Sequence, residues 1–310
     1  MDLSALTRLP RQLQAIARHP LNRGETVTAL MRWLNWQCVS RLSPGPIAVP
    51  FIGGTSLMCR PGETGVTGNV YYGLAEYVEM TFALRLLKAG DLFVDVGANA
   101  GSYTVLAAGA CGANVIALEP DKYAFSRLTL NVRLNNLSDR VEAHQAAAGD
   151  RNGSIDFLTG ADTGNRVSID GGRASPDIVT VPCVTLDTVV GDRQPTMLKI
   201  DVEGFEAAVL AGAGAILQCA SLLALIVETN GSDAVYGHTP GSLVDNLAGA
   251  GFSAASYNPD TNTIEPYASR RLPVEGNTIF VRMGSDVAER LTSSPFARDL
   301  RLRQPLAPGF

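Results

Sequence analysis

The chain lacks the cysteine patterns that mark disulfide frameworks and zinc sites. Its five cysteines are odd in number, lie far apart and never form C-x-x-C. A disulfide-stapled fold and a structural zinc site are therefore not predicted, and a reducing cytoplasm is the expected location. The N-terminal stretch also lacks the apolar core and cleavage site of a signal peptide, which favours the same location.

An excess of basic residues is also missing. The formal net charge is -5 over 310 residues, whereas generic binding to nucleic acid needs a concentrated basic surface. We therefore expect no nucleic-acid partner.

No stretch has the character of a transmembrane helix. Residues 207–227 carry no charge, but Gly212, Gly214 and Gln218 interrupt them. The run also changes from a helical to a strand-like pattern, so it predicts a buried helix followed by a buried strand. We expect no integral membrane segment.

The pattern of apolar residues divides the chain into three parts. Residues 1–82 combine helical periodicity with a Gly- and Pro-rich stretch at 45–70, and predict an extension of helices, short strands and turns that caps the acceptor side. Residues 83–285 alternate buried strands with helices, among them helices at 102–110 and 205–217. Residues 286–310 are interpreted as a C-terminal tail.

The alternating part predicts an open, doubly wound α/β sheet. Its strands read as continuous apolar runs, as expected for parallel strands covered by helices on both faces. Ligands of such sheets bind at the carboxyl ends of the strands. The chemistry is therefore expected directly after "DVG", "ALE", "KID" and "VET".

The loop after the first of these strands indicates the ligand. It has the spacing D-x-G-x-N-x-G, made by Asp95, Gly97, Asn99 and Gly101, and not the G-x-G-x-x-G of a dinucleotide site. Glu119 ends the next strand, where a carboxylate can accept both ribose hydroxyls. A loop that admits a ligand closely, without a phosphate cradle, favours S-adenosylmethionine.

Several motifs together resemble the FkbM family of S-adenosylmethionine-dependent methyltransferases. They are "DLFVDVGANAGSYT", "ALEPD", "VTLDTVV" and, most specifically, "LKIDVEGFEAAVLAGA". The resemblance implies a class I methyltransferase fold, a Rossmann-like sheet of about seven strands. It also implies methylation of hydroxyl oxygens on sugars, glycans or polyketide-type products.

The cofactor residues are assigned along the strand ends. Asp95 and Asn99 are expected at the methionine end and in the loop, and Asp201 is counted with them. Glu119 either holds the ribose or caps the helix that starts near Pro120. Gln145 either lies beside the adenine or is an ordinary polar residue at a strand end.

A second constellation, K-x-D-x-E-G-x-E, supplies acids for the acceptor. Lys199 and Asp201 alternate on one strand, where part of their role is expected to be mutual neutralisation, and Glu203 follows at the mouth of the cleft. An alcohol must lose its proton to a base, or to water after a divalent cation such as magnesium lowers its pKa. The candidates by position are Asp201, Glu203, Glu228 and His238.

The metal ligand set stays open, because Asp201 with Glu203 or Asn230 does not complete one. His19 and His144 are interpreted as structural. The leading hypothesis is an O-methyltransferase for a hydroxylated small molecule or glycan. The alternatives are a nicotinamide-dependent oxidoreductase and a cofactor-binding scaffold without catalysis. No pattern identifies the acceptor or the oligomeric state.

Overall fold

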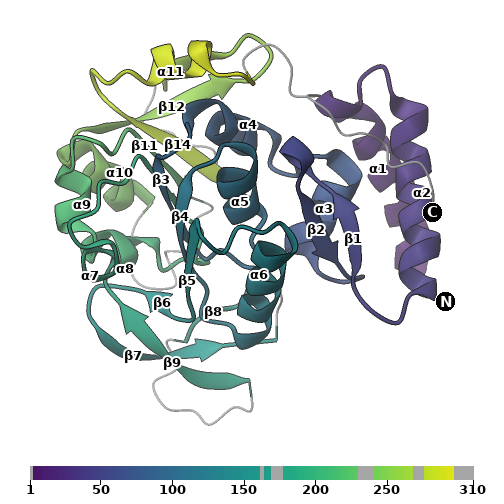
Figure 1. The fold of residues 1–310 in the computed structure, drawn as a ribbon, viewed down its shortest axis with the longest axis horizontal. Coiled ribbons are helices and arrows are strands. Elements are labelled where there is room, and N and C mark those ends of the chain that lie inside the picture. Colours follow the sequence, from purple (N-terminus) through teal and green to yellow (C-terminus); the bar gives the residue numbers. More distant parts are fainter. Residues whose placement is uncertain (1–2, 161–163, 169–176, 230–239, 268–275, 297–310) are drawn as a thin grey trace.

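A mixed β-sheet of eight strands forms the centre of the molecule (Figure 1). The computed structural model describes residues 3–160, 164–168, 177–229, 240–267 and 276–296. Within these ranges no helix is both long and apolar enough to cross a membrane.

Five neighbouring strands of the sheet are parallel, in the order β5-β4-β3-β10-β11. Three further strands continue beyond β11 in the order β14-β12-β13, and each pairs antiparallel with its neighbours. The bounds are β3 Leu92–Val96, β4 Asn114–Leu118, β5 Val141–His144, β10 Met197–Ile200, β11 Ala224–Glu228, β12 Phe252–Asn258, β13 Thr263–Pro266 and β14 Asn277–Arg282.

This strand order confirms the open, doubly wound sheet. The chain runs outward from β3 to β4 and β5 and then returns to β10 on the other side of β3. The direction of winding therefore reverses between β3 and β10, and their carboxyl ends flank the crevice in which such sheets bind ligands. The middle of the sheet is covered on both faces, so all four residues of β10 are buried.

The sheet has eight strands where about seven were expected, and β13 is the additional one. It forms a hairpin with β12 at the edge of the sheet, where Tyr257 pairs with Ile264. None of its four residues, Thr263–Pro266, is buried, and of these Ile264 alone packs against the core. A strand without a buried face leaves no apolar run, which is why the sequence pattern did not predict it.

Helices cover both faces of the sheet (Figure 1). One face carries α4 Tyr77–Leu86, α5 Ser102–Val105, the π-helix η3 Leu106–Ala110 and α6 Lys122–Leu134, with α11 Val287–Ser293 packed against α4. The other face carries α7 Leu186–Val190, α8 Glu206–Ala211, α9 Gly214–Gln218 and α10 Pro240–Gly249.

The helix expected at 205–217 is divided in two at Gly212. A Cβ at this position would lie 2.0 Å from the carbonyl oxygen of Gly149, so two backbones meet here. The carboxylate of Asp187 then accepts hydrogen bonds from the N–H groups of Ala215 and Ile216 and begins a second helix. The aspartate of "VTLDTVV" is therefore a helix cap.

A four-stranded sheet in the order β6-β9-β7-β8 extends from the lower end of the main sheet (Figure 1). Its bounds are β6 Ala147–Ala148, β7 Gly153–Leu158, β8 Arg166–Val167 and β9 Ile178–Val184. Phe157 and Val181 form a small apolar core with Phe205. The stretch "VEAHQAAA" thus contributes two strands, β5 and β6, which belong to different sheets.

The N-terminal extension packs beside α6 and continues the main core. It contains α1 Leu3–Arg18, η1 Pro20–Asn22, α2 Thr26–Leu42, β1 Ile47–Pro50, η2 Ile52–Gly54, β2 Ser56–Cys59 and α3 Thr64–Tyr72. Asn131 of α6 connects the extension to the main domain through its side chain. Its amide oxygen accepts a hydrogen bond from Met58 N, and its amide nitrogen donates one to the carbonyl of Ala100.

The helix α3 stands where strands and turns were expected. Its glycines and β-branched residues have low helix propensity. Val66 and Val70 are nevertheless buried in the main core, and this tertiary packing outweighs the local preference.

Candidate active site

A pocket of about 420 Å³ opens at the carboxyl ends of β3, β4, β10 and β11. We call it the strand-end pocket. Its charged lining residues are Glu76, Asp95, Glu119, Lys199, Asp201, Glu203 and Glu228. The wall also contains apolar surface from the small sheet, including Phe157 and Val167. Among the described lining residues, six carboxylates therefore face one ammonium group.

The glycine loop after β3 brings two strand ends into contact. Gly97 has a positive φ of 76°, and its N–H donates to the carbonyl of Leu118 at the end of β4. A Cβ on Gly97 would lie 1.9 Å from the carbonyl oxygen of Asp201. Only glycine allows the loops after β3 and β10 to approach this closely.

Gly101 serves packing, and it does not line the pocket. It is the N-cap of α5 with a positive φ of 88°, and a Cβ there would lie 2.6 Å from Leu128 of α6. The two glycines of the motif therefore have different tasks. Gly97 shapes the floor of the pocket, and Gly101 seats α5 against α6.

Glu119 is fixed by backbone N–H groups of the glycine loop and of the residues that precede α6. One carboxylate oxygen accepts from Asn99 N at 2.8 Å, and the other accepts from Asp121 N at 2.8 Å. Burial raises the pKa of Glu119 to about 7 against the lowering effect of these two bonds. Asp121 itself caps α6 by accepting from Ala124 N. Glu119 therefore joins the glycine loop to the start of α6 and still lines the pocket.

Asp95 lies fully inside the protein at the base of the pocket. One oxygen accepts from the hydroxyl of Thr104 at 2.6 Å, and the other has no hydrogen-bond partner among the described residues. Burial raises the pKa of Asp95, and Lys199, which pairs with it in register on β10, acts against this rise.

Lys199 is the one cation that lines this part of the pocket among the described residues. Its ammonium group donates to Asp201 at 2.6 Å and lies 4.8 Å from the ring centre of Tyr103. Burial by itself would lower the pKa of Lys199, but the carboxylates of Asp201 and Glu76 raise it above its ordinary value. The expected neutralisation of Lys199 by Asp201 is therefore present.

The turn after β10 presents Glu203 to the pocket. Glu203 has a positive φ of 55°, which is uncommon for a residue with a side chain. The carboxylate of Glu206 holds this turn, because it accepts hydrogen bonds from Val202 N and Gly204 N. The two glutamates of the motif therefore have different roles. Glu206 is buried and stabilises the turn, whereas Glu203 lines the pocket.

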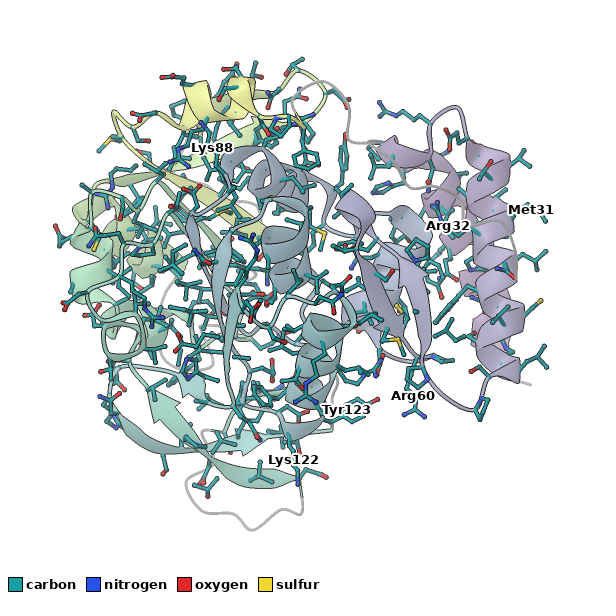
Figure 2. All side chains as sticks on the ribbon, viewed as in Figure 1. Met31, Arg32, Arg60, Lys88, Lys122 and Tyr123 are labelled. Carbon is teal, nitrogen blue, oxygen red and sulfur yellow. The ribbon has the colours of Figure 1, made fainter. Side chains whose placement is uncertain are left out.

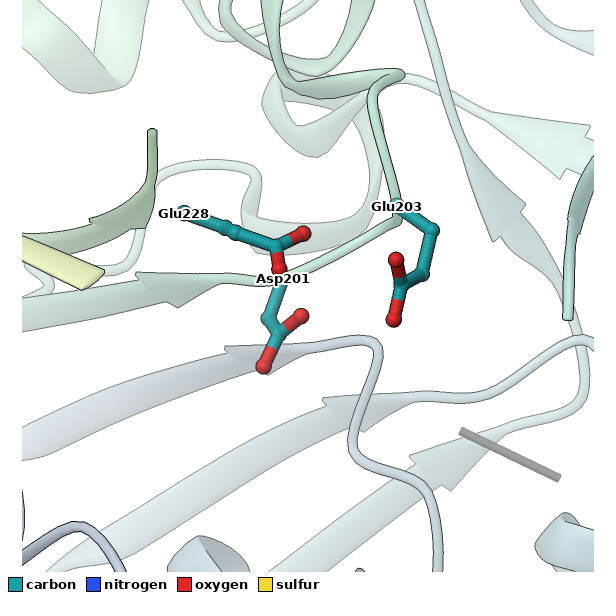
Figure 3. A group of neighbouring side chains, drawn as sticks. All are labelled: Asp201, Glu203 and Glu228. Atoms are coloured by element: carbon teal, nitrogen blue, oxygen red, sulfur yellow. The ribbon is translucent and has the colours of Figure 1, made fainter. Parts of the chain in front are cut away.

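Asp201, Glu203 and Glu228 converge at the ends of β10 and β11 (Figure 3). We call these three residues the acidic triad. One carboxylate oxygen from each lies within 4.8 Å of the others. Burial and the charges of Asp201 and Glu203 raise the pKa of Glu228 to about 9. Three partly buried carboxylates at this spacing can be relieved by a proton, by an organic cation or by a hard metal ion.

Two further polar residues complete the wall and were not predicted. The hydroxyl of Tyr103 donates to Glu76 at 2.7 Å, and the amide of Asn277 donates to the same oxygen at 3.0 Å. Tyr103 stands directly after the glycine loop, which was a usable signal. Asn277 begins β14, far from any motif, and only the fold brings it here.

Several sequence-predicted residues lie elsewhere. Gln145 is exposed and does not line the pocket, whose wall at this point is Ala146–Ala148. His144 contacts Glu142 at the surface, and His19 packs against the ring of Tyr72.

Two candidates cannot be placed. His238 and Asn230 fall outside the described residues.

The comparisons with known proteins identify the family. The profile of the methyltransferase FkbM domain matches residues 95–253, which is half of the chain. This chain belongs to the FkbM methyltransferase family. The match covers the glycine loop, Glu119 and the acidic triad together, so five of the six pocket carboxylates lie within the matched residues. No curated protein matches the sequence.

Solved structures with a similar arrangement are distant in sequence. A precorrin-6y C5,15-methyltransferase from Geobacter metallireducens has 11% identity over 75% of this chain and 97% of its own, with a TM-score of 0.41. An rRNA methylase from Streptococcus thermophilus has 15% identity over 66% and 93%, with a TM-score of 0.38. A Streptococcus mutans protein solved with SAH has 12% identity over 67% and 97%, with a TM-score of 0.38.

Proposed function

We propose that this FkbM protein is an S-adenosylmethionine-dependent O-methyltransferase for a hydroxylated small molecule, sugar or glycan. The observation that carries the proposal is the charge of the strand-end pocket, where six carboxylates face Lys199 alone among the described lining residues. A sulfonium nucleoside with an ammonium group is cationic and suits this lining. The pyrophosphate of a nicotinamide dinucleotide is anionic and finds no cradle there.

The residues around the glycine loop would hold the nucleoside. Gly97 has no side chain and would leave room for the cofactor at the floor of the pocket. The carboxylate of Glu119 accepts two backbone N–H groups and has further lone pairs that would accept the ribose hydroxyls. Asp95 and Asp201 lie beside Lys199, and their charges suit the ammonium of the methionine part. When bound, the cofactor supplies an electrophilic methyl group.

The acidic triad would prepare the acceptor. The chain must hold a hydroxyl oxygen in line with the methyl group, and orientation of this kind contributes up to roughly 7–11 kcal/mol. It must also receive the hydroxyl proton, and a carboxylate with a pKa raised toward neutrality is suited to this. Burial raises the pKa of Glu203, which suits it to this role. Glu228, whose pKa is raised to about 9, holds its proton at neutral pH and would serve as a base only after a nearby cation lowers that pKa.

A divalent cation offers a second route through the same residues. The three carboxylates would hold magnesium with oxygen ligands, and the cation would lower the pKa of the acceptor hydroxyl. Such an ion would also relieve the mutual repulsion of Asp201, Glu203 and Glu228. The chelator experiment below separates the two routes.

The N-terminal extension would form part of the acceptor side. Thr64, Gly65 and Glu76 from residues 1–82 line the pocket together with the main domain at 83–285, while the tail at 286–310 adds none of the described lining. The carboxylates would repel a phosphate backbone, so we favour a small acceptor over a nucleic acid. Scattered unpaired cysteines favour the cytoplasm.

Calorimetry with the purified full chain tests the cofactor. We expect binding of S-adenosylmethionine and S-adenosylhomocysteine and no binding of NAD or NADP. Affinity for NAD without a signal for either sulfur nucleoside would overturn the proposal.

Turnover with a panel of hydroxylated acceptors tests the triad. Asp201→Asn and Glu203→Gln should both lower turnover by about 100-fold or more, the scale of general acid–base catalysis. Glu203→Gln should lose little cofactor affinity, whereas Asp201→Asn should also weaken cofactor binding because it removes a charge beside the ammonium. The matched control is Glu265→Gln, an exposed glutamate on β13. Activity lost to a chelator and restored by magnesium would assign the metal route. If both variants keep normal turnover, the carboxylates are structural partners of Lys199.

A further inference from the structure

The outer face of α2 carries a continuous apolar stripe. Its members follow at intervals of three and four residues, so they share one side of the helix: Val27, Met31, Leu34, Cys38 and Leu42. Val27 is 75% exposed, and Leu42 is 84% exposed. The stripe extends over roughly 22 Å at the helical rise of 1.5 Å per residue.

The opposite face of the same helix is already occupied. Ala29 and Trp36 are buried, and α2 packs against α1 and α3. Arg32, on the inner side, donates to Asn22 and to the carbonyl of Tyr71. The apolar stripe is therefore not needed to attach the extension to the body. Figure 2 shows Met31 pointing into solvent at the end of the molecule farthest from the sheet.

The charge of this region is opposite to that of the body. Residues 1–45 contain six arginines, two acids and no lysine, a net charge of +4. Since the whole chain has a charge of -5, the remainder carries -9. Arg11, Arg18 and Arg41 are exposed on α1 or α2, and Arg23, exposed between them, pairs with Asp260.

We infer that the α1–α2 hairpin docks the protein on an anionic lipid surface. An amphipathic helix binds such a surface by burying its apolar face while arginines reach the headgroups. The stripe provides the apolar face, and the exposed arginines provide the charge. The helix lies on the membrane in this mode and does not cross it.

A second copy of the chain fits the hairpin less well. Pairing two stripes would bring two N-terminal regions, each with a net charge of +4, against each other. The body of another copy is acidic, but among the described residues its exposed large apolar side chains are scattered or, as Tyr123, Leu130 and Leu134 on α6, fewer and on average less exposed than those of the stripe. An anionic lipid surface satisfies both the charge and the apolar stripe.

Vesicle sedimentation with the full chain tests this inference. We expect binding to vesicles of equal parts phosphatidylcholine and phosphatidylglycerol, weakening at high salt, and little binding to phosphatidylcholine alone. Replacing Arg11 and Arg18 by Gln should lower the partition coefficient by roughly thirtyfold, because each arginine near an anionic surface contributes about fivefold.

The apolar stripe has a matched control. Met31→Ser with Leu34→Ser should abolish sedimentation, whereas Val179→Ser with Met283→Ser, which replaces exposed apolar residues elsewhere, should not. Circular dichroism checks that both pairs fold. No sedimentation of the wild type, equal binding to neutral vesicles, or a wild-type dimer in light scattering that the stripe variant dissociates would each overturn the inference.

Discussion

The two ends of the strand-end pocket use carboxylates in different ways. At one end both oxygens of Glu119 accept backbone N–H groups, from Asn99 and Asp121. At the other end the three carboxylates of the acidic triad lie within 4.8 Å of one another. Glu119 is thus fixed before any ligand arrives, whereas the triad is crowded by like charges.

This difference indicates which part of the site depends on its ligand. A carboxylate held by amides keeps its geometry in the free protein and can select a rigid group such as a ribose. Carboxylates that repel one another gain stability from whatever cation or proton enters. Substitutions can test this difference in three places: first at the contact between the two ends, then at Glu119, and last at the acidic triad.

The largest effect is expected from Gly97→Ala, which separates the two ends. The new Cβ would collide with the carbonyl oxygen of Asp201, 1.9 Å away, and the residue must also keep a positive φ. We expect the free energy of unfolding to fall by about 3 kcal/mol or more, with loss of measurable binding of S-adenosylhomocysteine. Urea unfolding and calorimetry measure the two effects.

Gly90→Ala is the matched control for this substitution. Gly90 also has a positive φ, of 87°, but no atom lies within 4 Å of its added Cβ. The left-handed conformation alone should cost about 1–2 kcal/mol. Equal losses in the two variants would mean that the contact with Asp201 has no special weight.

An intermediate effect is expected from Glu119→Ala at the fixed end. Removing the carboxylate leaves the N–H groups of Asn99 and Asp121 without their acceptor, and it removes the proposed partner of the ribose. The affinity for S-adenosylhomocysteine should fall by about 1.5–3 kcal/mol, the range for hydrogen bonds to charged groups.

Asp121→Ala separates cofactor binding from helix capping. Asp121 caps α6 through Ala124 N and does not line the pocket. This variant should lose about 1 kcal/mol of stability and keep its affinity. If Glu119→Ala behaves in the same way, the role of Glu119 is limited to bracing the start of α6.

The fold was predictable because its strands are buried on both faces. The runs around Val94, Leu198 and Leu225 are apolar except for Asp95 and Lys199, and the glycine loop and K-x-D-x-E-G-x-E stand at their ends. The pattern could not show β13 or α3, because one has no buried face and the other is helical only through its packing.

The site was predictable only where a motif carries the residue. Asp95, Glu119 and Asp201 line the pocket as the strand-end rule requires. Gln145 was placed by the same rule and is exposed, because the chain leaves β5 at His144 and turns Ala146–Ala148 to the wall. Asn277 reaches Glu76 across 201 residues, and no local pattern reports such a contact.

The smallest effect is expected from pH acting on the crowded end. Burial and the neighbouring carboxylates of Asp201 and Glu203 raise the pKa of Glu228 to about 9, against about 4.3 in an unfolded chain. Between these values the folded protein binds the proton more tightly, so stability falls as pH rises. The pKa values of Glu119 and Glu206 are raised only to about 7, so among these glutamates the decline above pH 8 belongs to Glu228. Burial also raises the pKa of Cys59 and Cys111 to about 12, and these thiols add a decline that Glu228→Gln leaves in place.

The melting temperature of the free protein should therefore fall by a few degrees between pH 8 and about 9. Glu228→Gln cannot ionise, so its melting temperature should change less over this interval, while the exposed control Glu265→Gln should follow the wild type. A cationic ligand favours the ionised carboxylate and should flatten the wild-type curve, whereas NAD should not. If S-adenosylmethionine leaves the slope unchanged, Glu228 does not face the cofactor's charge, and its raised pKa concerns the acceptor alone.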